Sequence, residues 1–245
     1  MLKKTAFFKK RVSKKEIQKR RMMSYFIEAV HKIIEEEGLE FITIRKVSDI
    51  AGYNSATLYN YFKDLDHLIF FASLKYLKDY VLNLPKWIKG YKNSVDKYLR
   101  IWKCFCYYSF NKPNIYNIIF FSKYSHSLKD AIKDYYTVFP EELMEEQSQE
   151  LLPMLLKHNI YERNFIILEE CASEGYINKE DIDKINDMTL LLYQGMLTRL
   201  LNCSVDYSID QTVSLALEYI FQIIKSFAKK DIPKDLYLFD SKETP

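Results

Sequence analysis

Residues 43–62, TIRKVSDIAGYNSATLYNYF, read as two short helices joined by a tight turn. Thr43 is placed to cap the first helix, because its hydroxyl oxygen can accept one of the free amide hydrogens at a helix start. Gly52 follows where this helix must stop, since glycine takes the left-handed conformation without a Cβ clash. Asn54 is the matching cap for a second helix of about two turns, from Ser55 to Tyr61.

Apolar spacing separates an inner from an outer face in this stretch. In the first helix, Ile44, Val47 and Ile50 recur at helical spacing and are expected to face inward. In the second helix, Leu58 and Phe62 take this role. The outer residues are small, polar or aromatic, which is the layout of a DNA-reading helix-turn-helix. An ordinary helical hairpin of a bundle is the alternative.

Residues 21–68 resemble the N-terminal domain of the TetR family of bacterial transcriptional regulators. The matching features are EEEGLEFIT (35–43), AG (51–52), TLY (57–59), YF (61–62) and Leu68. Three positions depart from the family pattern: Asn54 replaces a common serine, Ala56 a common glycine, and Leu65 a lysine that often faces a DNA phosphate. Lys63 is the candidate substitute for that phosphate contact.

The resemblance implies an all-α fold, with an N-terminal three-helix helix-turn-helix domain and a C-terminal helical ligand-binding and dimerisation domain. It also implies a homodimer that binds a double-stranded DNA operator, usually as a repressor, under the control of a small-molecule effector. By resemblance, Arg45 faces a guanine edge, which suits its guanidinium fork. The residues expected at the major groove are Ser55, Ala56, Tyr59 and Asn60. The residues expected at phosphates are Thr43, Thr57, Tyr61 and Lys63.

Length and composition agree with a two-domain helical protein. The chain has 245 residues, 48% of them apolar, with 5 glycines and 6 prolines, and no sustained alternation predicts a strand. We expect a basic arm at 1–13, the DNA-binding domain at 14–66, the ligand-binding and dimerisation domain at 67–230, and a polar tail at 231–245. The boundary falls within a fourth helix that Asp64 caps and that runs to about Leu82.

The first 21 residues carry ten Lys or Arg side chains against one acid, Glu16. A solvated tail is one interpretation. Beside a helix-turn-helix, such an arm can instead lie along DNA, where each neutralised phosphate releases counterions. Ser13 and Glu16 have capping-box spacing, so the first helix is predicted to begin near Lys14.

The C-terminal part shows a second, weaker resemblance to TetR-type ligand domains, at EGYI (174–177) and YQGML (193–197). Two long amphipathic helices are expected in this part, one over about 178–200, which contains YQGML, and one over 209–229. The apolar residues of each helix cover more than one narrow stripe, so each helix is expected to pack on two sides. The side chains expected at a dimer interface are Leu192, Met196, Leu200, Leu217, Phe221 and Ile224.

Aromatic residues crowd the segment 93–173. Tyrosine and tryptophan supply polar handles as well as apolar area, so the segment favours a mostly apolar ligand cavity, with plain core packing as the alternative. The candidate lining residues are Trp102, Phe105, Tyr108, Phe120, Tyr124, Tyr136, Phe139 and Phe165. Aromatic faces also suit a cationic or planar guest, but nothing in the sequence fixes its charge.

Other function classes find little support. The chain contains no nucleotide-binding, zinc-protease or serine-hydrolase motif, so we expect neither an enzyme nor a cofactor. Its four cysteines form no CxxC pair and His67 has no partner at ligand spacing, so we expect no metal and buried free thiols in a reducing cytoplasm. No apolar run reaches the length of about 18 residues that a membrane span needs. A ligand-independent DNA-binding or protein-interaction protein with the same fold is the alternative function.

Overall fold

The computed structural model of this chain describes residues 13–139, 151–155, 157, 159–203 and 207–233. Every regular element in these ranges is helical, so the all-α prediction is confirmed. The chain divides into two compact units. Among the described residues, unit 1 holds 13–72 and 134–139, and unit 2 holds the others.

This division differs from the expected one at 66–67. It falls between Ala72 and Ser73, at the end of α4 (Leu65–Ser73), so nearly the whole fourth helix belongs to unit 1. Unit 1 also takes in the second half of α8 (Leu128–Val138). The basic arm up to residue 12 and the tail from residue 234 lie outside the described residues.

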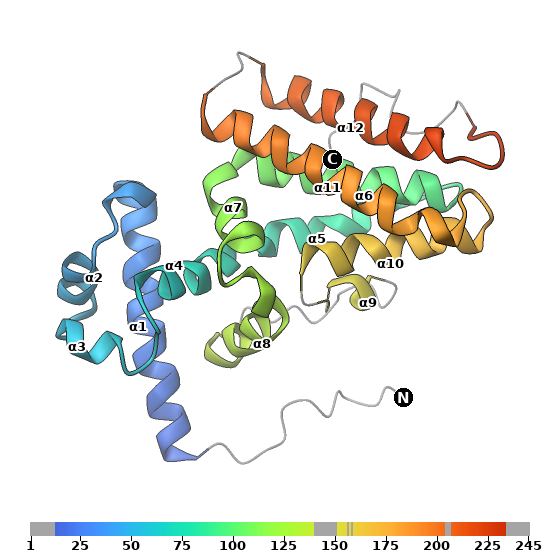
Figure 1. Ribbon diagram of the computed structural model, residues 1–245. Helices are drawn as coiled ribbons and strands as arrows, with labels where there is room; N and C mark the ends of the chain where they lie inside the picture. The colour runs from blue at the N-terminus through green and yellow to red at the C-terminus, as the bar shows by residue number, and fades with distance from the viewer. Residues whose placement is uncertain (1–12, 140–150, 156, 158, 204–206, 234–245) are drawn as a thin grey trace. The chain divides into compact units, whose positions relative to one another are not determined.

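Unit 1 is built on one long helix, α1 (Lys14–Glu36), which begins where predicted. The Ser13 hydroxyl accepts a hydrogen bond from the Glu16 amide at 3.2 Å. Figure 1 shows the next two helices along one side of α1. The elements that follow α1 are η1 (Leu39–Phe41), α2 (Ile44–Ala51), α3 (Ser55–Leu58) and α4.

Fully buried aromatic and aliphatic side chains join these helices. Phe26 of α1, Val47 of α2 and Leu58 of α3 have no more than 1% of their surface exposed, and Phe62 is equally buried. The Phe62 ring meets Phe26 edge-on at 6.5 Å and Phe71 at 5.9 Å, an arrangement that aromatic pairs favour. The predicted inward roles of Val47, Leu58 and Phe62 are confirmed.

Three predicted caps fix the two short helices of the motif. The Lys46 amide donates to Thr43 Oγ1 at 3.2 Å, and the Thr57 amide donates to Asn54 Oδ1 at 2.9 Å. Between them, Gly52 has φ 77° and ψ 25°, a left-handed conformation that a side chain would strain. The caps, and with them the start of each helix, are therefore as predicted.

Two details of the motif were predicted wrongly. α3 has only four α-helical residues, because the Asn60 and Tyr61 amides bond three residues back, to Thr57 and Leu58, and tighten the chain into 3₁₀-type turns. Ile50 is 40% exposed. The buried face of α2 is turned toward Val47 and Ser48, so the apolar spacing misplaced its last turn.

Unit 2 is organised around α6 (Ser94–Asn111), which packs against five other helices. Figure 1 shows α11 and α12 side by side within this unit. Its remaining helices are α5 (Leu77–Ile88), α7 (Pro113–Phe121), the start of α8, α9 (Leu152–Leu155), α10 (Ile160–Ser173), α11 (Ile182–Leu201) and α12 (Ile209–Ser226).

Because α6 is buried on nearly every side, its charged residues are paired. The Arg100 guanidinium donates to Asp96 at 2.9 Å, and the Lys97 ammonium donates to Glu170 of α10 at 2.6 Å. Asp96 and Lys97 are 1% and 3% exposed. Removing one partner of the Asp96–Arg100 pair would leave a buried charge uncompensated. The Lys97–Glu170 pair joins α6 to α10, so it constrains how α10 can pack.

The predicted fourth helix is in fact two. A 3₁₀ turn, η2 (Leu74–Tyr76), separates α4 from α5, and α5 continues past Leu82 and through Pro85 to Ile88. Proline costs a helix one hydrogen bond. Here the burial of Leu84 and Trp87, with no more than 2% of their surface exposed, offsets that cost and keeps the last turn helical.

Asn54→Ala should lower the free energy of unfolding by about 1 kcal/mol, because it removes the oxygen that caps α3. Urea denaturation followed by circular dichroism measures the change. Asn60→Ala is the matched control: its exposed side chain caps no described helix and should cost less than about 0.5 kcal/mol. Equal losses in both variants would contradict the capping role.

Candidate DNA-binding surface and ligand cavity

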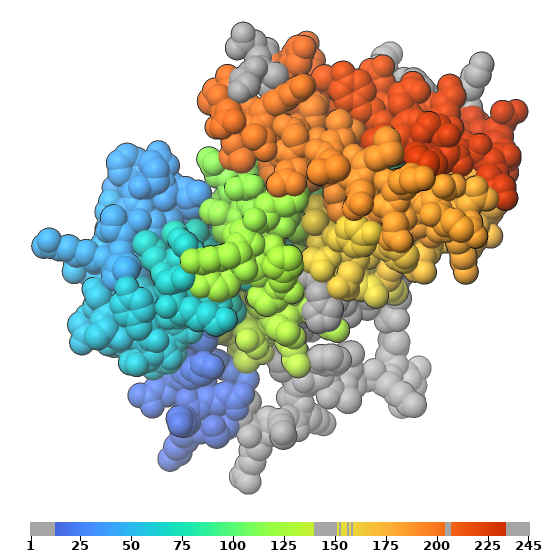
Figure 2. All heavy atoms as spheres, viewed as in Figure 1, coloured from blue at the N-terminus to red at the C-terminus, as the bar shows by residue number. Residues whose placement is uncertain are grey.

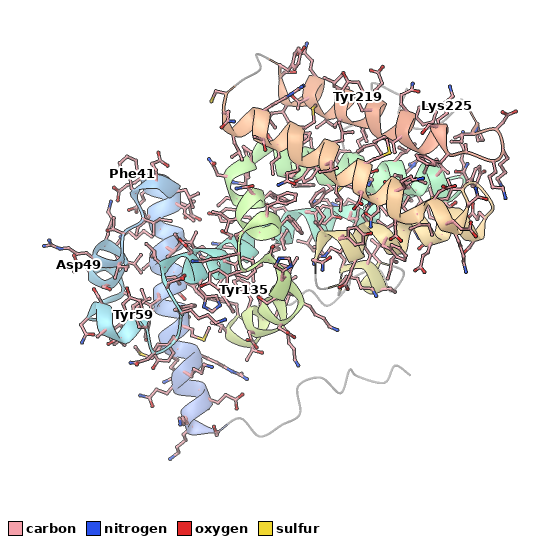
Figure 3. All side chains as sticks on the ribbon, viewed as in Figure 1. Phe41, Asp49, Tyr59, Tyr135, Tyr219 and Lys225 are labelled. Atoms are coloured by element: carbon pink, nitrogen blue, oxygen red, sulfur yellow. The ribbon has the colours of Figure 1, made fainter. Side chains whose placement is uncertain are left out.

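The outer face of α2 and α3 is the first candidate site. The Arg45 side chain is 93% exposed, and its Nε lies 3.9 Å from Asp49 Oδ2, a loose surface contact. Tyr59 is 52% exposed just after α3. Figure 3 labels Asp49 at the outer edge of α2 and Tyr59 beside α3. The Arg45 guanidinium is therefore open to solvent.

The predicted DNA-contact residues divide into two groups by exposure. Those exposed are Thr43, Arg45, Ala56, Tyr59, Asn60 and Lys63. Those half-buried are Ser55, Thr57 and Tyr61. The Thr57 hydroxyl donates to Asn54 Oδ1 at 2.9 Å, so it takes part in capping α3 as well as lying near its outer face. Their roles in DNA binding stay predictions.

Two further residues bear on this surface. The Lys46 ammonium is bound by the Glu37 carboxylate and lies 5.8 Å from the Phe41 ring centre, so its charge is partly neutralised. Tyr53, in the turn after Gly52, is 37% exposed, and its ring lies 5.8 Å from that of Tyr25. We add Tyr53 to the candidate surface. This pair could not be predicted from sequence patterns, because Tyr25 and Tyr53 are far apart along the chain.

His67 holds the segment that carries Lys63. The Lys63 amide donates to His67 Nδ1 at 3.1 Å, so this ring nitrogen must be unprotonated, and the His67 amide donates to Asp64 Oδ1 at 2.8 Å. The ring meets Phe71 edge-on at 5.0 Å. Burial, and then the positive charge of Lys63, lower the pKa of His67 below its usual value, against the opposing effect of Asp64.

Unit 2 contains a cavity of about 30 Å³, which is room for one or two water molecules. Its lining residues are Tyr80, Ile101, Trp102, Phe105, Phe120, Met154, Ile160, Arg163, Asn164 and Ile167. They come from α5, α6, α7, α9 and α10. A drug-sized ligand needs about 300 Å³ or more, so side chains fill most of the space that such a guest would take.

Three of the eight predicted lining residues meet at this cavity: Trp102, Phe105 and Phe120. Tyr108, Tyr124 and Phe165 do not line it, and Tyr136 and Phe139 belong to unit 1. Arg163 and Asn164 were not predicted to line it. Periodicity alone could not find them, because polar residues on a helix are normally expected on its outer face.

A chain of buried polar groups runs from the cavity to α11. Trp102 Nε1 donates to Asn164 Oδ1 at 2.9 Å, and Asn164 Nδ2 donates to Asn186 Oδ1 at 2.9 Å. Asn186 Nδ2 in turn donates to the Tyr161 carbonyl oxygen at 3.1 Å. The cavity wall is thus fixed to α11 by directed hydrogen bonds as well as by packing.

The outer sides of α11 and α12 carry exposed apolar residues. Met188 and Leu191 of α11 are 42% and 68% exposed, and Tyr219 of α12 is 40% exposed. Gly195, one turn after Leu191, has nothing within 4 Å of where a Cβ would lie. Figure 2 shows the two helices as a continuous surface of unit 2, and Figure 3 labels Tyr219 on α12.

The predicted dimer-interface residues are distributed differently from this exposed set. Met196, Leu217 and Ile224 are buried within the subunit itself, with no more than 4% of their surface exposed. Leu192, Leu200 and Phe221 are half-buried. Part of the apolar stripes of α11 and α12 is therefore buried within the subunit, and the assignment of these residues to a dimer interface stays a prediction. The sequence could not say which part faces α6 and which part faces outward.

No group of metal-binding residues occurs in the described ranges. Cys104, Cys106 and Cys171 are buried free thiols, and burial raises the pKa of Cys171 to about 12. Cys203 is exposed, which corrects the expectation that all four are buried. None of the described helices is both long and apolar enough to cross a membrane.

Comparisons with known proteins find a shared fold. No protein-family model and no curated protein matches the chain. The solved structure of RolR with resorcinol matches with a TM-score of 0.54 at 13% identity, covering 89% of this chain and 98% of RolR. A protein of unknown function from Rhodococcus sp. RHA1 matches with a TM-score of 0.52 at 12% identity, covering 85% of this chain and 96% of that one.

A TetR family transcription regulator from Shewanella sp. PV-4 gives a TM-score of 0.49 at 10% identity, over 85% of this chain and 99% of that one. At such identities the likeness is one of fold. The chain has the all-α fold that its sequence indicates, and it shares this fold with RolR.

The lowered pKa of His67 predicts a pH dependence of stability. The unfolded state, with a pKa near 6.5, takes up a proton more readily than the folded state. The stabilisation is therefore complete above about pH 6.5 and lost as the pH falls toward the folded pKa. Between about pH 7.5 and pH 5.5, the Tm of the wild-type chain should fall by more than the Tm of His67→Gln, because the variant has no titrating ring at this position. Parallel plots of Tm against pH for the two chains would show that His67 contributes nothing to this dependence.

Proposed function

We propose that this chain is a sequence-specific DNA-binding transcriptional regulator of the TetR type, most simply a repressor, and not an enzyme. The observation that carries the proposal is the capped helix-turn-helix, with Arg45 and Tyr59 exposed on its outer face. The basic residues that precede α1 add sequence-independent attraction to phosphates. A cytoplasmic location and bacterial origin are part of the proposal.

The proposed regulator acts as a homodimer. Two helix-turn-helix units related by a two-fold axis must meet successive major grooves, about 34–36 Å apart. The exposed apolar residues Met188, Leu191 and Tyr219, with the open surface at Gly195, support an interface of α11 and α12 with the same helices of a second copy. Stable interfaces of this kind commonly exceed about 2,000 Å².

A small-molecule effector in unit 2 is the proposed control. The cavity beside Trp102, Phe105 and Phe120 supports this site, and the hydrogen-bond chain from Asn164 to α11 gives it a route to the proposed interface. RolR has a fold like that of this chain, and its structure holds resorcinol. The small volume of the cavity favours the alternative, a ligand-independent regulator, in which no effector changes DNA affinity.

Selection of bound duplexes from a random pool should yield a near-palindromic sequence for the wild-type chain. Arg45→Ala should then relax the preference at one position of each half-site and cost roughly 1–3 kcal/mol, because a bidentate base contact is lost. Lys46→Ala is the control, since Glu37 already binds its ammonium, and it should change the preference little. Equal binding of all duplexes by the wild-type chain would contradict the proposed sequence specificity.

Deleting residues 1–12 should weaken binding to every duplex and flatten its dependence on salt, because phosphate contacts are lost without base contacts. Competition between specific and random duplexes at several salt concentrations separates this effect from that of Arg45→Ala. An altered sequence preference after the deletion would instead assign base contacts to the arm.

Leu191→Asp should convert the dimer to a monomer without unfolding the subunit, because this side chain is 68% exposed within one subunit. Sedimentation at micromolar concentration, with circular dichroism as the folding check, measures the outcome. Leu82→Asp, a charge at a leucine 45% exposed on α5, should leave the dimer intact. A wild-type monomer would contradict the homodimer.

A further inference from the structure

Two neighbouring tyrosines lie exposed on unit 1, one on α1 and one just before α3. Tyr25 of α1 is 44% exposed, and Tyr53, in the turn after Gly52, is 37% exposed. Their ring centres are 5.8 Å apart, and the Tyr53 ring also lies 5.9 Å from that of Phe26 in the core of unit 1. The ring of Tyr53 is therefore held against α1, although its backbone belongs to the turn that leads into α3.

The backbone of this turn is fixed on both sides of Tyr53. Its amide donates to the carbonyl oxygen of Ser48 at 3.0 Å, and the next residue, Asn54, caps α3. The tyrosine pair thus occupies a defined place beside the segment 55–60, which carries the residues expected at the major groove.

The hydroxyl groups distinguish this pair from two phenylalanines. Among the residues that the structure describes, neither the Tyr25 nor the Tyr53 hydroxyl has a hydrogen-bond partner. The ring contacts alone would be made equally well by phenylalanine. A phenol O–H is a hydrogen-bond donor, and tyrosine is one of the side chains that donate to phosphate oxygens in protein–DNA complexes.

A positively charged strip on α1 leads to this pair. Its exposed members, spaced three or four residues apart and therefore on one face of the helix, are Lys14, Gln18, Arg21 and Tyr25. The first acid on the same face is Glu28, about one turn beyond Tyr25. The strip therefore carries only positive charge from the start of α1 up to the tyrosine pair.

Two adjacent arginines of α1 differ in how far their charge is neutralised. The Arg20 side chain is 24% exposed and lies 3.6 Å from the carboxylate of Glu16, one turn earlier. Arg21 is exposed, and no carboxylate in the described part of the chain pairs with it. The Arg21 guanidinium can therefore neutralise a phosphate, and Arg20 supplies a matched control.

We propose that Tyr25 and Tyr53 donate hydrogen bonds to phosphate oxygens of the operator, and that Arg21 neutralises a neighbouring phosphate. One face of α1 then continues the phosphate contacts of the basic residues before it as far as the start of α3. This inference rests on the proposed function, since it adds α1 and its tyrosine pair to the same DNA-binding site.

Tyr25→Phe and Tyr53→Phe keep both rings and remove only the hydroxyls. Each should weaken binding about 5-fold or more, because a hydrogen bond to a charged acceptor is lost. The loss should be equal for the selected duplex and for random duplexes, since phosphates carry no sequence information. Tyr207→Phe, at a tyrosine 53% exposed in unit 2, should bind like the wild-type chain. The Tm of each variant checks its folding.

The salt dependence of binding separates the hydroxyls from the charge. Both tyrosine variants should keep the wild-type slope of affinity against salt, because they remove no charge. Arg21→Gln should reduce this slope by about 1, whereas Arg20→Gln should change it less. An unchanged slope in Arg21→Gln would contradict its phosphate contact.

Neutral methylphosphonates, placed at one phosphate of the selected duplex at a time, locate the hydrogen bonds. At one position or more, this change should weaken binding by the wild-type chain at least about 3-fold more than binding by Tyr25→Phe, because only the wild-type chain has a hydrogen bond to lose there. The same comparison applies to Tyr53→Phe. A hydroxyl that acted only through packing would give equal losses at every position, and this result would overturn the inference.

Wild-type affinity in Tyr25→Phe or in Tyr53→Phe would also overturn the inference. If the wild-type chain selects a duplex and either variant binds it unchanged, the tyrosine contacts are refuted and the regulator is not. If the chain binds all duplexes equally and both variants bind them more weakly, the sequence specificity is refuted and the tyrosine contacts are not. Absence of binding to any duplex would refute both.

Discussion

The burial of α6 on nearly every side is the constraint on which unit 2 depends. A helix in that position must satisfy each polar group it carries, because water cannot do so. Asp96 and Arg100 therefore pair with each other, and Lys97 reaches Glu170 of α10. The same helix contributes Trp102 and Phe105 to the cavity. The Lys97–Glu170 pair thus holds α6 against α10, the helix that also brings Arg163 and Asn164 to the aromatic wall.

In unit 1, the helices α2 and α3 are short and exposed, so packing alone would stabilise them only weakly. Side-chain caps at Thr43 and Asn54 and the left-handed Gly52 define where α2 and α3 begin and end. The Phe62 ring, packed against Phe26 and Phe71, then fixes the chain that leaves α3. On the outer face, Arg45, Tyr59 and Asn60 are exposed, whereas Thr57 shares in a cap.

Local chemistry explains what the sequence could predict. Caps depend on neighbours three residues apart, so Ser13, Thr43, Asn54 and Gly52 were identified without knowledge of the fold. The exposure of Ile50, the passage of α5 through Pro85 and the burial of Met196 within its own subunit depend on distant helices. For the same reason Arg163 was missed: its side chain is polar, and only the positions of α7 and α9 place its charge inside the unit.

Because α3 is short, a single subunit could contact only a few base pairs through it. Four residues at 1.5 Å each advance roughly 6 Å, which is less than two base-pair steps of about 3.4 Å. A reader of that length samples only a few base pairs, and sites that match so few occur by chance throughout any genome. In a regulator built this way, specificity for one operator must come from the spacing and symmetry of its two half-sites. A change of operator would then arise from a change in the distance between the two recognition helices as readily as from a change in the base-contacting residues.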